Sequence, residues 1–361
     1  MTSGGTPAAI TFSHSSPAGS PVVRIGRVKP VERVKMADVA KAAGVSVATV
    51  SKVVNGRDGI SAATFEKVLS AVSDLGYETS LGARSLRSHK TNVLGVLLAE
   101  FEPFSTELLK GVSEAIGSTD YELLAYSGGH RGKAVGWERR SLGRLAGSLI
   151  DGAIIVTPTV VDAGSGIPVV AVDPHTGPVD VPTVDSDNLA GAVLATNHLL
   201  ELGHRRIALL GGRPDLESAR LREQGFRAAM AAAGVPVDES LVVVGGYRPE
   251  TAEGPARLLL TRDDRPTAVF ATNDLSAIRT MQVAAELGVS VPDDLSVIGF
   301  DNVPESALAN PPLTTINQPL REMGATALEI LVRMLEGREP DATHVTLPTS
   351  MVERASCRRL A

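Results

Sequence analysis

The chain has almost no cysteine and no long apolar run. Its 361 residues include one cysteine, Cys357, which excludes an intrachain disulfide and fits a reducing compartment. No segment approaches the ~18 consecutive apolar residues of a membrane span. The N-terminus also lacks the basic stretch followed by an apolar one that marks a secretory signal. These absences predict a cytoplasmic protein with no membrane partner.

Motifs of catalysis and of cofactor binding are also missing. Gly211-Gly212 follows an apolar run and suggests a phosphate loop, but neither GxGxxG nor GKS/GKT is present. The seven histidines are scattered, and His198 and His204 do not have the spacing of metal ligands. No GxSxG motif or pair of carboxylates stands out. We therefore expect no catalysis, no metal and no cofactor.

Positive charge is scarce in most of the chain and gathers at its front. The net charge is −6, but residues 1–90 hold twelve Lys/Arg and six Asp/Glu, so the remainder carries −12. A basic front on an acidic body suggests that only the front meets a polyanion such as DNA. Residues 1–33 are rich in Ser, Gly, Pro and Thr without periodicity, which predicts a disordered tail.

Next comes a pair of short helices joined by a tight turn. The stretch VKMADVAKAAGVSVATVSKVVN predicts helices over 37–43 and 46–54 around Gly44, which can take the positive φ that the turn needs. Ser46 stands at an N-cap position. The exposed front of the second helix then carries small side chains, hydroxyls and one cation, as a helix-turn-helix recognition helix does: Val47, Ala48, Thr49, Ser51 and Lys52.

A third helix over 61–75 completes a small domain at 34–77. Its predicted apolar stripe consists of Phe65, Val68, Leu69, Val72 and Leu75. Residues 78–91 have few large apolar side chains and several cations, so they predict a linker that does not hold a helix alone. From residue 92 onward, near-continuous apolar runs alternate with amphipathic stretches, which predicts parallel sheets covered on both faces. Two such sheets fit the length better than one.

Several signatures, in this order and spacing, resemble the LacI family of bacterial transcriptional regulators: ADVAKAAGVSVATVSKVVNG, ARSLR, HLLELGHRRIALLGG, FATNDLSA, VPDDLSVIGFDN and PPLTTINQP. The resemblance implies an all-α helix-turn-helix head, a hinge, and an α/β core of two doubly wound parallel-sheet subdomains, like periplasmic binding proteins. It places the effector-binding core at 92–347, with a C-terminal segment at 348–361. The N-subdomain would comprise 92–185 and 318–345, and the C-subdomain 188–316.

The resemblance also implies which residues meet DNA. Val47, Ala48 and Lys52 match positions that face base edges in the major groove, while Thr49, Ser51 and Asn55 match phosphate contacts. Two apolar side chains can contact thymine methyls but cannot form bidentate bonds. Simple solvation of the two hydroxyls is the alternative. Lys35 stands where a capping Thr or Ser is frequent, and we expect Asp38 to serve that helix start instead.

The hinge would add a second DNA contact through Ala83, Arg84 and Leu86, which match positions that enter the minor groove. Leu86 resembles the apolar wedge that unstacks a base step and kinks the duplex. Packing of Leu86 against the core is the alternative. We expect the hinge to be disordered without operator DNA.

For the core, the resemblance implies that Arg222, Asn273 and Asp301 hydrogen-bond the hydroxyls of a sugar, with Asp173 as a further acceptor. Other side chains would supply apolar faces or stand where relatives carry an aromatic: Phe104, Tyr247, Phe300 and Leu320. Phe300 fits plain core equally well. Such a cleft lies outside the carboxyl ends of the strands.

These residues predict a repressor of carbohydrate-metabolism genes, released from a pseudo-palindromic operator by a sugar or sugar phosphate. A purine or nucleobase corepressor is an alternative, although 3% aromatic content leaves few rings for stacking. A solute-binding receptor or an enzyme with an incidental helical head is a second alternative. The end of the chain, MVERASCRRLA, is too short for a tetramer-forming coil, so we expect a homodimer.

Overall fold

The computed structural model describes residues 34–54, 59–77, 90–128, 135–160, 166–177 and 180–360. The chain forms two compact units, Met1–Thr79 and Ser80–Ala361, which are described in turn. The predictions that lie outside the described residues are the tail at 1–33, Asn55, and Ala83, Arg84 and Leu86 of the hinge.

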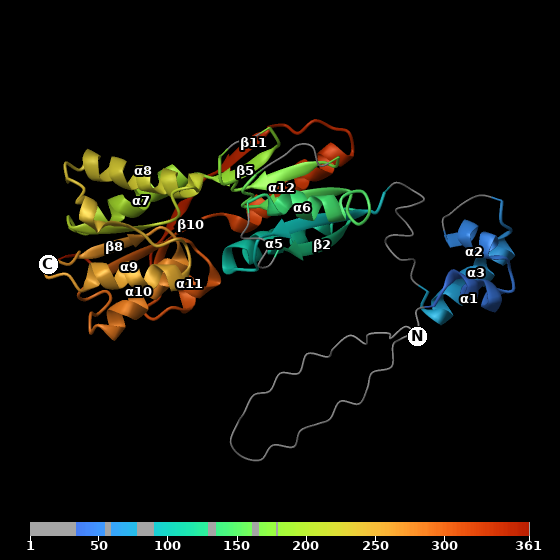
Figure 1. Ribbon diagram of the computed structural model, residues 1–361, viewed down its shortest axis with the longest axis horizontal. Coiled ribbons are helices and arrows are strands. Elements are labelled where there is room, and N and C mark those ends of the chain that lie inside the picture. Colours follow the sequence, from blue (N-terminus) through green and yellow to red (C-terminus); the bar gives the residue numbers. More distant parts are fainter. Residues whose placement is uncertain are drawn as a thin grey trace, which may run out of the picture. The chain divides into compact units, whose positions relative to one another are not determined.

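The first unit is a three-helix head (Figure 1). Its helices are α1 (Met36–Ala43), α2 (Val47–Val54) and α3 (Ala62–Leu75). Gly44 adopts φ 63° at the turn after α1. The Ser46 hydroxyl accepts from the backbone N–H of Thr49 at 3.1 Å, so Ser46 caps α2 as predicted. The Asp38 carboxylate accepts from the N–H of Lys35 at 2.7 Å, which satisfies one unpaired donor at the start of α1.

The apolar face of α3 differs from the predicted stripe. Val68 is fully buried, but Phe65, Leu69 and Leu75 are 38%, 40% and 37% exposed. The helix packs through Val68 and Ala71, and Val72 of the predicted stripe is partly buried against the same core. The core of the head is made of small aliphatic side chains: Val39, Ala40, Ala43, Val50, Val53, Val68 and Ala71.

The second unit contains two sheets with six strands each (Figure 1). The first has the order β11 (His344–Leu347), β5 (Thr183–Ser186), β4 (Val169–Val172), β3 (Gly152–Val156), β1 (Val93–Leu98), β2 (Glu122–Ser127), all parallel. The second has the order β12 (Ser350–Val352), β10 (Thr314–Asn317), β9 (Ser296–Asp301), β8 (Ala268–Ala271), β6 (Ile207–Gly211), β7 (Val242–Val244), where only β12 is antiparallel.

Helices cover both faces of each sheet, which confirms the predicted fold class. The first sheet carries α5 (Pro103–Ile116) and α12 (Leu320–Leu335) on one face and α6 (Trp137–Leu145) on the other. The second carries α9 (Pro249–Leu260) and α10 (Asp274–Glu286) opposite α7 (Asn188–Glu201) and α8 (Glu217–Ala232); α11 (Pro304–Leu308) follows β9. Successive residues of β1 and β6 enter opposite cores, so both strands are continuously apolar. Among the described residues, no helix is long and apolar enough to cross a membrane.

The chain passes between the sheets after β5, after β10 and after β11. We call the first sheet with its helices the N-lobe (90–186 and 318–347) and the second the C-lobe (187–317 and 348–360). The predicted separate segment at 348–361 requires a correction. Its β12 completes the second sheet, Ser356 is buried and donates to the carbonyl of Val297, and the N–H of Leu360 bonds to the carbonyl of Leu202. Its described part therefore belongs to the C-lobe.

Candidate functional site

A cavity of about 440 Å³ lies between the lobes, at the carboxyl ends of their strands. Both lobes contribute to its wall. Six of the eight predicted effector contacts line it: Phe104, Asp173, Arg222, Tyr247, Asn273 and Asp301. Phe300 and Leu320 do not. Phe300 is fully buried beneath Arg222, and Leu320 packs in the apolar core between the N-lobe sheet and α12.

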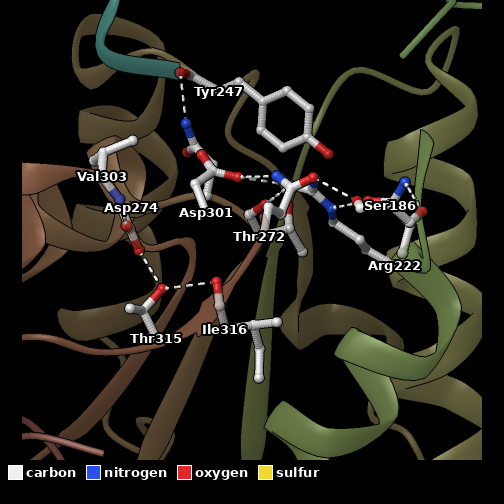
Figure 2. A network of polar contacts seen from close by, with 12 residues as sticks. Ser186, Arg222, Tyr247, Thr272, Asp274, Asp301, Val303, Thr315 and Ile316 are labelled. Carbon is white, nitrogen blue, oxygen red and sulfur yellow. Dashed lines mark hydrogen bonds and ion pairs between the residues drawn. The ribbon is translucent and has the colours of Figure 1, made fainter. Parts of the chain in front are cut away.

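Arg222, on α8, is the fixed centre of the C-lobe wall (Figure 2). Its side chain is 3% exposed. Nε donates to Asn188 at 2.8 Å, and Nη1 donates to the carbonyl of Thr272 at 2.5 Å. The guanidinium carbon lies 3.8 Å from the ring centre of Phe300 and 5.5 Å from that of Tyr247. Hydrogen bonds and two ring faces therefore hold the cation before any ligand arrives.

Asp301 ends β9 beside this arginine, 3.4 Å from Nη1. Burial raises its pKa to about 7, although Arg222 opposes the shift. The side-chain amide of Gln318 donates to Asp301 at 2.6 Å, and the Ser186 hydroxyl donates to Gln318 at 2.5 Å. Gln318 and Ser186 lie where the chain crosses between the lobes. Hydrogen bonds therefore connect Asp301 to two of the crossing segments.

A second carboxyl group stands behind Asp301. Asp274, at the start of α10, is fully buried and accepts from the hydroxyl of Thr315 at 2.5 Å and from the N–H of Val303 at 2.9 Å (Figure 2). Burial, followed by the nearby charge of Asp301, raises the pKa of Asp274 well above its usual value. This shift favours the protonated form of Asp274, which limits charge repulsion within the pair.

Asn273 and Tyr247 form the adjoining part of the C-lobe wall. The Asn273 carbonyl oxygen caps α10 by accepting from the N–H of Ser276 at 3.1 Å, and its amide donates to the carbonyl of Tyr247 at 3.1 Å. The Tyr247 hydroxyl is buried, and no hydrogen-bond partner for it exists in the part of the chain that the structure describes. A ligand hydroxyl in the cavity would relieve that deficit.

On the N-lobe side, Asp173 follows β4 and has a carboxylate with no ion pair among the described residues. Burial raises its pKa, and the charge of Arg222 lowers it in part. Phe104, near the start of α5, contributes an apolar patch to the same wall. This lobe therefore presents an acceptor to which no described residue donates a hydrogen bond.

Backbone strain concentrates at this cavity. Six described non-glycine residues have positive φ, and four of them line it: Thr157 (46°), Asp173 (48°), Tyr247 (66°) and Asp301 (116°). Such conformations cost of order 1–3 kcal/mol each and persist only where the surroundings impose them. These four residues surround one cavity, which indicates a site that positions side chains for a ligand.

Several wall residues were not predicted from the sequence: Glu102, Trp137, His175, Arg213, Ser218 and Arg248. Glu102 stands at the N-cap of α5, in the loop that follows the apolar run of β1, and this position is a weaker signal than the strand end at Asp173. Arg248 forms an ion pair with Glu100 of the N-lobe at 2.7 Å, and the N–H of Glu217 donates to the carbonyl of His175 at 2.9 Å. These two contacts join the lobes, and sequence order does not reveal them.

In the head, α2 presents the predicted DNA-facing residues. Val47 is 48% exposed, and Ala48 and Lys52 are exposed beside it, while Thr49 and Ser51 are half-buried. The hydroxyls of Thr49 and Ser46 share a hydrogen bond of 2.9 Å, so Thr49 already has a local partner. Residues 47, 48, 51 and 52 lie on one side of the helix because they are one turn apart.

A helix-turn-helix head, together with a two-lobed core whose cavity lies at the strand ends, defines a class: regulators that bind both DNA and a small molecule. The chain belongs to the LacI family. The model of bacterial regulatory proteins of the lacI family matches residues 35–80, and that of the periplasmic binding protein-like domain matches residues 196–357.

Similarity to known proteins extends over nearly the whole chain. It is 36% identical to the HTH-type transcriptional repressor PurR of Photobacterium profundum, across 90% of this chain and 98% of that protein. The structure of a transcriptional regulator CelR–cellobiose complex is 32% identical, with a TM-score of 0.68 over 90% of this chain and 100% of that one. The lac repressor dimer bound to operator and the anti-inducer ONPF is 26% identical, with a TM-score of 0.77 over 91% and 100%. This chain is therefore a LacI-family transcriptional regulator.

Proposed function

We propose that this regulator is a homodimer that binds a pseudo-palindromic operator and changes its affinity for that DNA when a small carbohydrate occupies the cavity. The observation that carries this proposal is the cavity itself, which lies between two lobes and combines donors and acceptors with apolar faces. The operator-bound lac repressor dimer and the cellobiose complex of CelR support it by similarity. The protein would work at the chromosome, in the cytoplasm, and without catalysis.

The head would read one half-site. Val47 and Ala48 suit thymine methyls, and Lys52 can donate to guanine. Thr49, Ser51 and Asn55 would contact phosphates and fix the register. In the hinge, Ala83, Arg84 and Leu86 would enter the minor groove, with Leu86 as the wedge. Since the base contacts of α2 are few, half-site spacing in a two-fold dimer would carry much of the specificity.

In the core, Arg222, Asn273 and Asp301 would bind hydroxyls from the C-lobe side, while Asp173 accepts from the N-lobe side. Phe104 and Tyr247 would cover the apolar face of the sugar ring. We leave Phe300 and Leu320 out of this contact set, because one supports Arg222 from below and the other is part of the N-lobe core.

Coupling to DNA requires that the ligand bind one lobe arrangement better than another. The described arrangement has direct contacts between the lobes at Arg248–Glu100 and Glu217–His175. A ligand held by Asp173 and Asp301 would add contacts to both lobes and so favour it. Because Asp301 is bonded to Gln318 at a crossing, the occupied cavity acts on the segments about which the lobes move.

A purine effector is the second candidate, supported by the similarity to PurR. The cavity wall carries the rings of Tyr247, Phe104 and Trp137, which suffice to stack one base despite the low aromatic content.

A mobility-shift assay tests the proposal. The full chain is incubated at moderate salt with DNA from upstream of its own reading frame, with and without single sugars and purines. We expect a discrete complex that one ligand class weakens or strengthens. Binding of no fragment above background would overturn the DNA-binding proposal, and a complex that no ligand alters would overturn the effector proposal.

The contribution of α2 can be measured in the same assay. Lys52→Ala should weaken operator binding by about 1–3 kcal/mol, the scale of one good base contact. Lys67→Ala, which removes an exposed cation from α3, is the matched control and should have a smaller effect. Equal losses from the two variants would mean that Lys52 contributes only general charge.

A further inference from the structure

Every arginine among the described wall residues is paired with an acid. Each of the three has an acid of its own: Arg213 with Asp215, Arg222 with Asp301 and Arg248 with Glu100. His175 lies in the same wall, and burial, followed by the charge of Arg213, lowers its pKa, so its ring is neutral at pH 7. Among the described wall residues, no arginine is left without an acid partner.

Two acids of the wall have no such partner. Glu102 and Asp173 line the cavity, and neither forms an ion pair with a described residue. Burial raises the pKa of both, while Arg248 and Arg222 oppose those shifts from a distance. The wall thus has a surplus of two carboxyl groups over its arginines, one from the start of α5 and one from the end of β4.

Arg222 is also unsuited to grip an oxyanion. A phosphate or carboxylate is bound best by two parallel N–H groups of one guanidinium. Here Nε is committed to Asn188 and Nη1 to the carbonyl of Thr272. The remaining donors, on Nη2, suit a single hydroxyl oxygen.

The same cavity contains a polar group without a partner. The Tyr247 hydroxyl is buried, and no described residue bonds to it. Together with the carboxylate of Asp173, it offers a donor and acceptors to a polyhydroxylated molecule. A cavity of about 440 Å³ is within the size range of small-molecule sites.

We propose that this cavity selects against anionic ligands, so that the effector is an unphosphorylated sugar, neutral or carrying an amino group, and that Asp173 and Glu102 impose the selection. The inference rests on the proposed effector function of the same cavity. A phosphate placed there would meet two acids that have no ion pair with a described residue, while every arginine among the described wall residues already has an acid partner. Each carboxylate should disfavour the phosphate ester by about tenfold or more relative to its parent sugar.

Thermal-shift and calorimetric titrations of the full chain with matched pairs test this. The pairs are glucose and glucose 6-phosphate, ribose and ribose 5-phosphate, and trehalose and trehalose 6-phosphate, with glucosamine added. We expect stabilisation by at least one unphosphorylated member and at least a hundredfold weaker binding of its phosphate. A phosphate ester that binds as tightly as its parent overturns the inference alone. If no sugar of either kind binds, the proposed carbohydrate effector fails and the inference fails with it.

Variants identify the responsible groups. In the double variant Asp173→Asn, Glu102→Gln, the preference for the sugar over its phosphate should fall by at least tenfold, whatever happens to absolute affinity. The control variant Asp263→Asn, Glu339→Gln removes two exposed charges that are distant in sequence from Asp173 and Glu102. It should leave the preference for the sugar over its phosphate unchanged. An unchanged ratio in the first variant would mean that other groups exclude the phosphate.

Discussion

The two lobes share one strand order but hold their cavity residues differently. In the C-lobe, Arg222 and Asn273 are bonded to neighbours within that lobe. In the N-lobe, Asp173 is not bonded to any described residue, and the indole N–H of Trp137 is buried without a described partner. Equal folds therefore provide a C-lobe wall in which Arg222 and Asn273 are already hydrogen-bonded, although the Tyr247 hydroxyl is not, and an N-lobe wall in which Asp173 has no described hydrogen bond.

This difference suggests that the two walls have different roles in ligand binding. A wall fixed by its own hydrogen bonds loses little entropy when a ligand arrives, so it can anchor the ligand. A wall with unused acceptors gains most from the ligand, so it can determine which ligand draws the lobes together. The predictions below test this contrast through stability, from the largest expected change to the smallest.

Replacing the C-lobe arginine should have the largest effect. Arg222→Met leaves Asp301 buried without its cation, and we expect the free energy of unfolding at pH 8 to fall by about 3–5 kcal/mol. Arg213→Met, which breaks a pair whose two side chains are about half exposed, should cost less than ~1 kcal/mol in the same denaturant titration. Similar losses from both variants would remove the case for a pre-built C-lobe wall.

The N-lobe should contribute a pH dependence to the free energy of unfolding through Asp185. Burial raises the pKa of Asp185 on β5 to about 7, with further contributions from Asp173 and Glu217. The folded state then holds a proton that the unfolded chain loses near pH 4, so stability is lost as pH rises from about 4 to about 7. Asp185→Asn should reduce the change in the free energy of unfolding between about pH 4 and about pH 7 by an amount on the order of a few kcal/mol. Denaturant titrations across that pH range measure it. An unaltered slope would contradict the assignment.

The ion pair between the lobes should matter less. Glu100 and Arg248 are 28% and 40% exposed, so a double-mutant cycle with Glu100→Gln and Arg248→Met should give a coupling of roughly 0.5–1 kcal/mol. The same variants should lower effector affinity, because the pair joins the two walls. A coupling near zero would leave the backbone bond at His175 and the bonds between Gln318 and Asp301 as described contacts between the lobes.

The smallest stability change is expected at Asp173. Asp173→Asn removes a desolvated carboxylate that has no ion pair with a described residue, so the free energy of unfolding should change by less than about 0.5 kcal/mol while effector binding weakens at least tenfold. A stability loss close to that of Arg222→Met would show that Asp173 supports the fold rather than the ligand.

The sequence predicted the parts of the fold that rest on strong local patterns. Continuous apolar runs identified β1, β3, β4, β6, β8 and β9, because both faces of these strands are buried. The edge strands β11 and β12 were missed, since they are short and half exposed. The stripe on α3 was misassigned because the pattern favoured large side chains, whereas close helix packing used Ala71.

For the site, the sequence favoured residues at strand ends, and the resemblance selected Arg222, Asn273 and Asp301 among them. Neither the sequence nor the resemblance identified Trp137 or Arg248. Neither stands directly at the end of an apolar run, and each reaches the cavity only because the two lobes face each other. The resemblance also placed Phe300 among the effector contacts. In the structure its ring packs beneath the guanidinium of Arg222 instead of facing the cavity.

Trp137 has a practical consequence. It is the only tryptophan in the sequence, and it lies in the cavity wall. Selective excitation at the red edge of protein absorbance therefore addresses one ring, so the chain carries its own optical probe at the place where a ligand is expected. A spectral change during titration reports on that wall alone, without a dye or a label.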